Sequence, residues 1–595
     1  MANWAEKDIL PATVPVPQRR PQWSKWRVYG LITLLATPVV LRCATHLGPF
    51  LPGRGFARLN DANICPQADA LYPDRNAPLW ERLGNDFSQD AFTLRAVEWL
   101  GGAVRVPTES YDKMGPVGVD ERWEAFGPFH DYLLRSFPLT HETLTLTKVN
   151  TYGLLYEWKG SDDTLKPLLL AAHQDVVPVD PKTVDQWKFP PYSGHYDGES
   201  IWGRGSTDDK SGLIGIYSSV ETLLEKGFKP TRTIVLAFGF DEEASGLQAS
   251  TTLLLAPRLG GAQSLSQALL KRYGEDSFAL LVDEGVGFSD VGGSVIAVPG
   301  IAEKGYIDAM VTVSTAGGHS SIPPPHTSIG ILSRLLVEFE ANPIKPQLDR
   351  DTPIYRTVQC VGQHAKEFPA HLRALIKTSA HSDRALRKLE AELIKDPAYK
   401  SLIGTTQAID LIQGGVKSNA LPEEVWAVVN HRIATQSSVS VVQQRDTDLL
   451  KQLAKEFNLT FTAFGSDITP KGTPTAGRLT LTDAWGTSLE PAPVTPTEDS
   501  VPWRLLSGTI KAVYNAHRGL EGADNIFVSP GIMSGNTDTR YYWKLTPHIV
   551  RYSHQGGVDI STIHSVNEHI GANDFVEMIR FFTTLILNVD EATTL

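Results

Sequence analysis

Three short apolar segments, each followed at once by acidic residues or a histidine, constrain the possible folds of this chain most. They are LLLAA (168–172), IVLAFGF (234–240) and FALLV (278–282), and each is typical of a strand buried on both faces of a sheet. Between the first two, residues 208–227 show the apolar spacing of a helix and end at a glycine. Strands that alternate with helices predict an α/β fold, a three-layer catalytic domain with a mostly parallel sheet.

A different pattern begins near residue 302. The segment YIDAMVTVST alternates like a half-exposed strand, and the order of the segments after it (helix, two strands, helix, strand) completes a split βαβ unit. The α/β pattern then returns and continues to the end of the chain. We therefore expect a smaller ferredoxin-like α+β lid domain over 303–466, inserted between two parts of the catalytic domain, 88–302 and 467–595.

The N-terminal region predicts a membrane anchor. Basic residues precede the apolar run VYGLITLLATPVVL (28–41), which favours a signal anchor with a cytosolic N-terminus. The run has 14 residues, fewer than the roughly 20 that span a bilayer, so a cleaved signal peptide and an ordinary buried helix remain alternatives. We expect a disordered cytosolic tail over 1–26, the anchor over 27–50 and a stalk or wrapping extension over 51–87.

Composition limits the classes of function and the redox chemistry. The net charge of −12 argues against a nucleic-acid partner, which usually requires a basic face. Three cysteines exclude a disulfide-dense scaffold; Cys65 and Cys360 can form one bridge in an oxidising compartment or remain two buried thiols. The sequon NLT at Asn458 fits a glycoprotein whose body lies in a lumen.

Acidic and histidine side chains gather where ligand sites form in an α/β sheet, beyond the carboxyl ends of the strands. Taken singly, each is more often structural; Asp208, for example, could be a helix N-cap. Together, so many carboxylates at one rim would repel each other unless cations lay between them. Imidazole nitrogens with carboxylate oxygens suit Zn²⁺, with Mn²⁺ or Co²⁺ as alternatives, and the ligands suffice for two ions sharing one carboxylate. The residues concerned are His173, Asp175, Asp208, Asp209, Asp241, Glu242, Glu243, Asp283 and Glu284.

These motifs together resemble a known family. HQDVVPV, GRGSTDDKSG, DEE, DEG and a late IHSVNE occur in the order found in the dinuclear zinc metallopeptidases, which include carboxypeptidase S, aminoacylase and glutamate carboxypeptidase. GGHSSIPPPHTSIG and VKSNALPEEVWAVVNHRI strengthen the resemblance, which is greatest to the carboxypeptidase S-like branch. Each motif alone is weak evidence, whereas the ordered set, which spans residues 173 to 569, is strong, and the resemblance covers 88–595.

The resemblance implies a ligand set for two Zn²⁺ per chain. Asp208 would bridge the two ions, and a non-proline cis peptide would join it to Asp209. The ligand in DEG is Asp283 or Glu284, because strand alternation turns only one of them toward the metals; we expect Asp283. The full set is His173, Asp208, Glu243, Asp283 and His564.

The resemblance also implies roles for residues that need not touch metal. Glu242 would act as general base toward a zinc-bound water, whose pKa zinc lowers to about 7. Asp175 would accept a hydrogen bond from the second ring nitrogen of His173 and so fix its tautomer. His319 would polarise the scissile carbonyl and Arg432 would bind a substrate carboxylate. The substrate-binding set is His319, Asn419, Arg432, Asp538 and Arg540.

The activity implied is that of a zinc-dependent metallocarboxypeptidase that hydrolyses the C-terminal peptide bond of short peptides. The alternative is an N-acyl amino acid hydrolase/synthase with the same site, because both reactions involve an amide beside a free carboxylate. The resemblance further implies a homodimer through the lid domain. With the anchor, it implies a single-pass membrane protein whose catalytic domain lies in the lumen of the vacuole or the secretory pathway.

Overall fold

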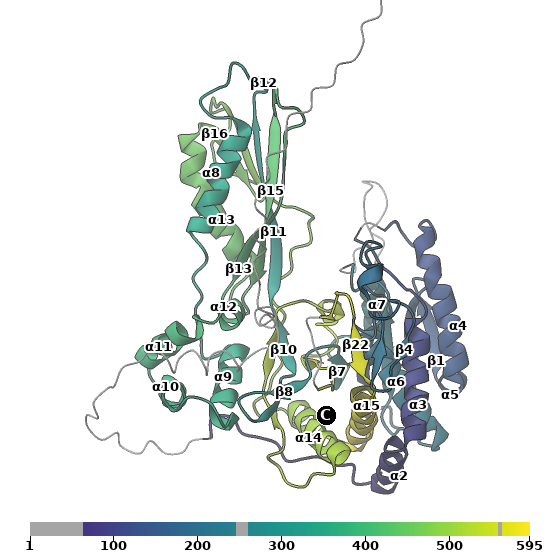
Figure 1. Ribbon diagram of the computed structural model, residues 1–595. Helices are drawn as coiled ribbons and strands as arrows, with labels where there is room; N and C mark the ends of the chain where they lie inside the picture. The colour runs from purple at the N-terminus through teal and green to yellow at the C-terminus, as the bar shows by residue number, and fades with distance from the viewer. Residues whose placement is uncertain (1–62, 113, 245–259, 557–561) are drawn as a thin grey trace, which may run out of the picture.

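The computed structural model describes residues 63–112, 114–244, 260–556 and 562–595. It consists of a catalytic domain and a lid that extends away from it (Figure 1). The expected cytosolic tail (1–26) and membrane anchor (27–50) lie outside the described residues. Among the described helices, none combines the length and the apolar character that crossing a membrane requires.

An eight-stranded mixed sheet forms the centre of the catalytic domain. Strands β6, β3, β7 and β21 run parallel to one another, as the apolar segments predicted. On one side β2 is antiparallel to β6 and β1 to β2, and on the other side β10 is antiparallel to β21. The strands, in sheet order, are β1 (Thr145–Val149), β2 (Gly153–Trp158), β6 (Ile234–Gly239), β3 (Leu168–His173), β7 (Leu280–Asp283), β21 (Ile549–Arg551), β10 (Gly300–Glu303) and β20 (Gly531–Met533).

Helices cover both faces of this sheet, which confirms the three-layer α/β class. Alternate side chains of β3 enter separate cores: Leu168 and Leu170 pack with one helical layer, whereas Leu169 and Ala171 pack with the other. The first layer contains α2 (Ala77–Phe87), α3 (Asp90–Val104), α4 (Phe126–Ser136), α6 (Lys210–Glu225), α14 (Val501–Arg518) and α15 (Ala572–Glu591), with α5 (Pro138–Thr143) beside α6; the second contains α7 (Gly261–Tyr273).

The lid is built on a six-stranded sheet with α8 (Ser328–Ala341) and α13 (Val439–Glu456) packed against it. Strand β18 pairs with both β11 and β16, so the lid sheet reaches Asp483 and passes the boundary at residue 466 that we expected. The strands, in sheet order, are β13 (Thr406–Gly414), β15 (Glu424–Ile433), β11 (Gly305–Thr315), β18 (Gly477–Asp483), β16 (Leu459–Ala463) and β17 (Ser466–Asp467). A two-stranded ribbon, β12 (Gly318–His319) with β14 (Ala420–Leu421), lies at its outer end (Figure 1).

Four helices that the sequence did not lead us to expect interrupt the lid. They share a core of their own, in which Ile354, Leu372 and Leu389 pack together with Phe527 of the catalytic domain. This helical section therefore belongs beside the catalytic domain rather than in the lid sheet (Figure 1). Its helices are α9 (Pro353–His364), α10 (Ala370–Ser379), α11 (Asp383–Leu393) and α12 (Pro397–Ile403).

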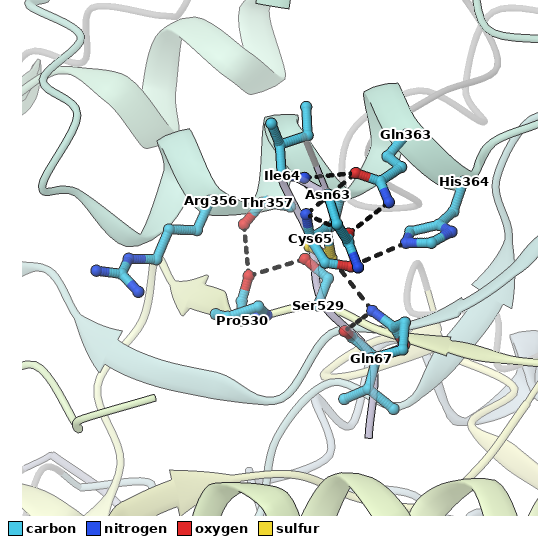
Figure 2. The surroundings of a disulfide bond; sticks show 12 residues. Asn63, Ile64, Cys65, Gln67, Arg356, Thr357, Gln363, His364, Ser529 and Pro530 are labelled. Carbon is cyan, nitrogen blue, oxygen red and sulfur yellow. Dashed lines mark hydrogen bonds between the residues drawn. A yellow bond between two sulfur atoms is a disulfide. The ribbon is translucent and has the colours of Figure 1, made fainter. Parts of the chain in front are cut away.

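A disulfide joins Cys65 to Cys360 of α9, across a sequence separation of 295 residues. Figure 2 shows the hydrogen bonds around it: Gln363 Oε1 accepts from Ile64 N, and the ring of His364 lies 3.1 Å from the carbonyl of Cys65. Of the two alternatives left open by the sequence, the structure therefore contains the bridge. It fastens the N-terminal extension to the helical section.

Candidate active site

The carboxyl ends of three neighbouring strands bring the predicted ligands to one rim of the main sheet. His173 is the last residue of β3, Glu243 follows β6, and Glu284 follows β7. Asp208 lies in the turn that precedes α6, and His564 lies in the loop before β22 (His569–Gly571). Residues from five separate segments therefore meet at a single place, as the strand-end motifs predicted.

Asp208 lies between two histidines. Its Oδ1 atom is 3.1 Å from Nε2 of His173, and its Oδ2 atom is 3.1 Å from Nε2 of His564. The same nitrogen of His564 is 3.0 Å from Oε2 of Glu243, and that of His173 is 3.6 Å from Oε2 of Glu284. Each carboxylate oxygen of Asp208 thus faces a different set of ligand atoms, which is the arrangement that a bridging carboxylate requires.

The donor atoms fit metal ions. Two groups of ligand atoms each lie within 4.8 Å of one another: His173 with Asp208 and Glu243, and His173 with Asp209 and Glu284. Glu243 Oε1 and Asp209 Oδ2 are buried and accept no hydrogen bond, so both are available to a cation. Carboxylate oxygens with imidazole nitrogens suit Zn²⁺. The peptide bond between Asp208 and Asp209 is cis, as the family resemblance implied.

The geometry favours Glu284 over Asp283, contrary to our expectation. Glu284 belongs to one of the two ligand groups, whereas Asp283 belongs to neither. The Asp283 side chain is buried, and the charged groups that act on it include Glu303 and Arg551. Consecutive residues at a strand end face opposite sides, so only one of the pair can reach His173.

Asp175 lies next to the ligand cluster and contacts Glu242, Glu243 and His173. Its Oδ1 atom accepts the backbone N–H of Glu242 (3.1 Å), and its Oδ2 atom accepts the N–H of Glu243 (3.0 Å). Nδ1 of His173 lies 3.0 Å from the carbonyl oxygen of Asp175 and 3.3 Å from its Oδ1. The second ring nitrogen of His173 is therefore held by Asp175, which leaves Nε2 free to face the ligand cluster. Ser110, which we did not predict, donates its hydroxyl to Asp175 Oδ2 at 2.6 Å.

Burial and mutual charge alter the acidities of the cluster. Burial raises the pKa of Glu242 well above its usual value. Burial, with the charge of Asp208, raises the pKa of Glu243 to about 7. Hydrogen bonds to Asp208 and Glu243 raise the pKa of His564 to about 10. Metal binding would therefore displace protons from Glu243 and His564.

The predicted substrate-binding residues fall into two places. His319 and Asn419 lie together at the exposed outer end of the lid, where Ser320 N donates to the carbonyl of Asn419, and they do not meet the ligand cluster (Figure 1). Arg432 lies at the base of the lid, where its guanidinium is 3.4 Å from Asn536 Oδ1.

The other two residues lie in the catalytic domain. Asp538 is buried, and its carboxylate lies against the backbone of Gly239 at the end of β6. Arg540 donates Nε–H to the carbonyl of Thr537, and the charge of Glu242 acts on it. Of the five predicted substrate-binding residues, Asp538 and Arg540 are therefore placed nearest the rim that carries the ligands.

A mixed α/β sheet with a lid and a rim of histidine and carboxylate ligands defines a metal-dependent hydrolase of the metallopeptidase and amidohydrolase class. The sequence profile of peptidase family M20/M25/M40 matches residues 169–588, and the chain belongs to that family. Carboxypeptidase S of Saccharomyces cerevisiae is 43% identical over 508 residues, 84% of this chain and 85% of that protein. The chain lies in the carboxypeptidase S-like branch of the family and is a metallopeptidase/amidohydrolase enzyme.

Two further similarities bear on this identification. The N-fatty-acyl-amino acid synthase/hydrolase PM20D1 of Bos taurus is 30% identical over 519 residues, 86% of this chain and 90% of that protein. The crystal structure of human carnosine dipeptidase 1 matches with a TM-score of 0.54 at 15% identity, over 88% of this chain and all of that one (100%). The structural similarity confirms the fold.

Proposed function

We propose that this enzyme is a zinc-dependent carboxypeptidase that removes the C-terminal residue of short peptides, with two Zn²⁺ per chain. The observation that carries the proposal is the position of Asp208, whose two oxygens face His173 and His564 at 3.1 Å each. When bound there, the metal ions would supply Lewis-acid activation of water and of the scissile carbonyl. The ligands would be His173, Asp208, Glu243, Glu284 and His564.

Glu242 is the proposed general base. It lies beside the ligand Glu243, its backbone is fixed by Asp175, and burial raises its pKa well above the usual value of a glutamate, which makes it a stronger base. Glu242 takes a proton from the attacking water and returns it to the leaving amine. Arg432 or Arg540 binds the free carboxylate of the substrate, since a guanidinium offers two parallel N–H donors to a carboxylate.

The second candidate is an N-acyl amino acid hydrolase/synthase that uses the same residues. The similarity to the PM20D1 enzyme over most of both chains favours this alternative. Both substrates present a carboxylate beside the scissile amide, so the catalytic residues are the same in both cases. The two differ in what precedes that amide: a peptide in one case, an acyl chain in the other.

Product analysis on matched substrates tests the proposal. The purified protein is given a panel of N-blocked dipeptides and of N-acyl amino acids that share one C-terminal residue, with and without a chelator. We expect release of the C-terminal residue from the dipeptides, loss of this activity with chelator, and recovery with two equivalents of Zn²⁺. Faster release of the C-terminal residue from the N-acyl amino acids than from the dipeptides would favour the N-acyl amino acid hydrolase/synthase over the carboxypeptidase. Activity that survives complete metal removal would exclude both.

The proposed homodimer forms through the lid. Strand β13 lies at the edge of the lid sheet, and its Leu411 and Ile412 are 47% and 64% exposed. An exposed edge strand with apolar side chains is prone to pair with another chain. Because His319 lies at the outer end of the lid, it reaches a ligand cluster only after a lid movement or in a second copy. Sedimentation of wild-type protein and Ile412→Lys tests the interface, and the variant should be monomeric.

We propose that the catalytic domain is lumenal, in the vacuole or secretory pathway, behind the anchor at 27–50. The disulfide between Cys65 and Cys360 supports an oxidising compartment. The sequon asparagine Asn458 is exposed in the turn after α13, where a glycan has room. An endoglycosidase should increase the gel mobility of the wild-type protein. It should not change the mobility of Asn458→Gln or Thr460→Ala. If the mobility of the wild-type protein does not change either, Asn458 carries no glycan, and the sequon no longer supports a lumenal location.

A further inference from the structure

Glu568, which none of the roles above uses, connects two ligand-bearing segments. It is fully buried, at 0% exposure, four residues after His564. One carboxylate oxygen, Oε1, accepts the backbone N–H of Thr207 (2.9 Å) and of Asp208 (3.2 Å). The other, Oε2, lies 2.5 Å from the guanidinium of Arg204. A single side chain from the His564 loop therefore holds the backbone of the proposed bridging residue.

The backbone reinforces this connection. The carbonyl of Glu568 accepts the N–H of Gly203, and the hydroxyl of Thr207 donates to the carbonyl of His569. Strand β22 also pairs with β5 (Ser200–Trp202), the strand that leads into the Asp208 turn. The segments 200–208 and 564–571 thus form one unit, in which Glu568 makes the contact nearest to Asp208.

The charge of Glu568 is compensated within the same unit. Arg204 is 4% exposed, and its pairing with Glu568 adds no net charge to a rim already rich in carboxylates. A buried carboxylate with an arginine partner and two backbone donors has little freedom to move. The orientation of the Asp208 backbone is therefore fixed by a rigid contact, and not only by the ligands that Asp208 faces.

We propose that Glu568 is a positioning residue: it fixes the segment that carries Asp208 relative to the segment that carries His564, so that both side chains can bind the metals together. The inference rests on the metal site proposed above. Residues that orient metal ligands typically change metal affinity about 10–100-fold when they are replaced. We therefore expect Glu568→Gln, which loses the pair with Arg204, to bind metal about 10–100-fold more weakly than wild type.

The protein offers a matched control. Glu577 is also fully buried, with Oε1 2.5 Å from Nη1 of Arg518. The same oxygen lies 3.2 Å from Nε2 of the buried residue His554. It lies within α15 and makes no contact with a ligand of the proposed site. Glu577→Gln should lower thermal stability like Glu568→Gln, because each leaves an arginine without its partner, while its metal affinity should equal that of wild type.

The experiment titrates metal-stripped full-length protein with Co²⁺ and Zn²⁺ against a competing chelator, and records the visible spectrum of the Co²⁺ form. Weaker affinity and an altered spectrum in Glu568→Gln, but not in Glu577→Gln, support the proposal. If Glu568→Gln does not fold, Glu568→Asp decides, since it keeps the charge but cannot reach both backbone donors. Equal affinities in the Glu568 variants and wild type overturn the positioning role. A wild-type protein that binds neither metal overturns the metal site instead.

Discussion

Asp175 holds the backbone of Glu242, the proposed general base, through a 3.1 Å hydrogen bond from Glu242 N–H to Asp175 Oδ1. The same carboxylate accepts the N–H of Glu243 and lies 3.3 Å from the ring of His173. One buried aspartate therefore supports a base, a metal ligand and a ligand tautomer together. Its negative charge matters to each of the three contacts.

Asp175→Asn should reduce activity and metal retention by about 10–100-fold. An asparagine keeps one acceptor oxygen, but its NH₂ group faces one backbone N–H, together with the ring of His173 or the hydroxyl of Ser110, depending on which oxygen it replaces. Activity is measured as the rate of hydrolysis of one dipeptide, and metal retention is measured as the metal content after dialysis. Ser110→Ala is the control, because it removes only the 2.6 Å hydroxyl contact and leaves the charge; its effect should be within a few-fold. Wild-type behaviour of Asp175→Asn would reduce Asp175 to a packing role.

Glu284→Gln and Asp283→Asn distinguish the two adjacent acids. Because Glu284 lies 3.6 Å from His173 Nε2 and Asp283 is in neither ligand group, Glu284→Gln should lose one of the two metal ions. Asp283→Asn should keep both and lose stability at most. Metal analysis by mass spectrometry on the two variants gives the answer. Loss of a metal ion in Asp283→Asn alone would restore our sequence-based expectation.

The part of the fold that local patterns determine was predictable from the sequence. The apolar segments of β3, β6 and β7 and their polar ends gave both the sheet class and the rim where ligands meet. Among the helices that were not predicted, α11 has apolar positions that are interrupted throughout by charged residues, in DRALRKLEAEL. Strand β18 was not predicted, because its formation depends on tertiary pairing with β11 and β16 and not on a local sequence pattern.

The candidate site shows the same limit. Ligand types and their order along the chain follow from the motifs, whereas the choice between Asp283 and Glu284 depends on the register at the end of β7, which no local pattern fixes. Glu568 is within the quoted IHSVNE motif, yet its contact with Asp208 joins two distant segments. The bridge between Cys65 and Cys360 could be named as a possibility but not decided, because it depends on where α9 packs.

His130 should make the protein less stable at acidic pH. Burial, with the nearby charge of Lys148, lowers its pKa to about 4, and its ring lies 2.8 Å from Gln174 Oε1 and 3.0 Å from Lys148 Nζ. Because this pKa lies below the unfolded value of 6.5, the folded state binds fewer protons between the two values, and stability falls as the pH is lowered through that window. We expect this group to lower the free energy of unfolding by about 2 kcal/mol at pH 5.

Urea unfolding at pH 7 and pH 5 measures this loss. The difference between the two pH values should be smaller in His130→Gln, whose side chain does not titrate, than in wild type. His381→Gln, at an exposed position, is the control and should retain the wild-type difference. An unchanged difference in His130→Gln would assign the acid sensitivity to other groups.

Removing the disulfide should lower stability without changing the chemistry. The bridge closes a loop of 295 residues, and loss of a native disulfide typically costs about 2–5 kcal/mol. The double variant Cys65→Ser/Cys360→Ser should unfold at lower temperature, and a protease should cut its N-terminal extension sooner. Its kcat on the dipeptide should match wild type, because neither cysteine belongs to the ligand groups.

Thiol counting establishes that the bridge is present before this comparison is made. Of the three cysteines, Cys65 and Cys360 should resist alkylation in denaturant until a reductant is added, whereas Cys43 should react at once unless it is modified. Three reactive thiols without reductant would contradict the bridge and, with it, the oxidising compartment. A double variant as stable as wild type would instead show that the contacts of Gln363 and Gln67 suffice to hold the extension.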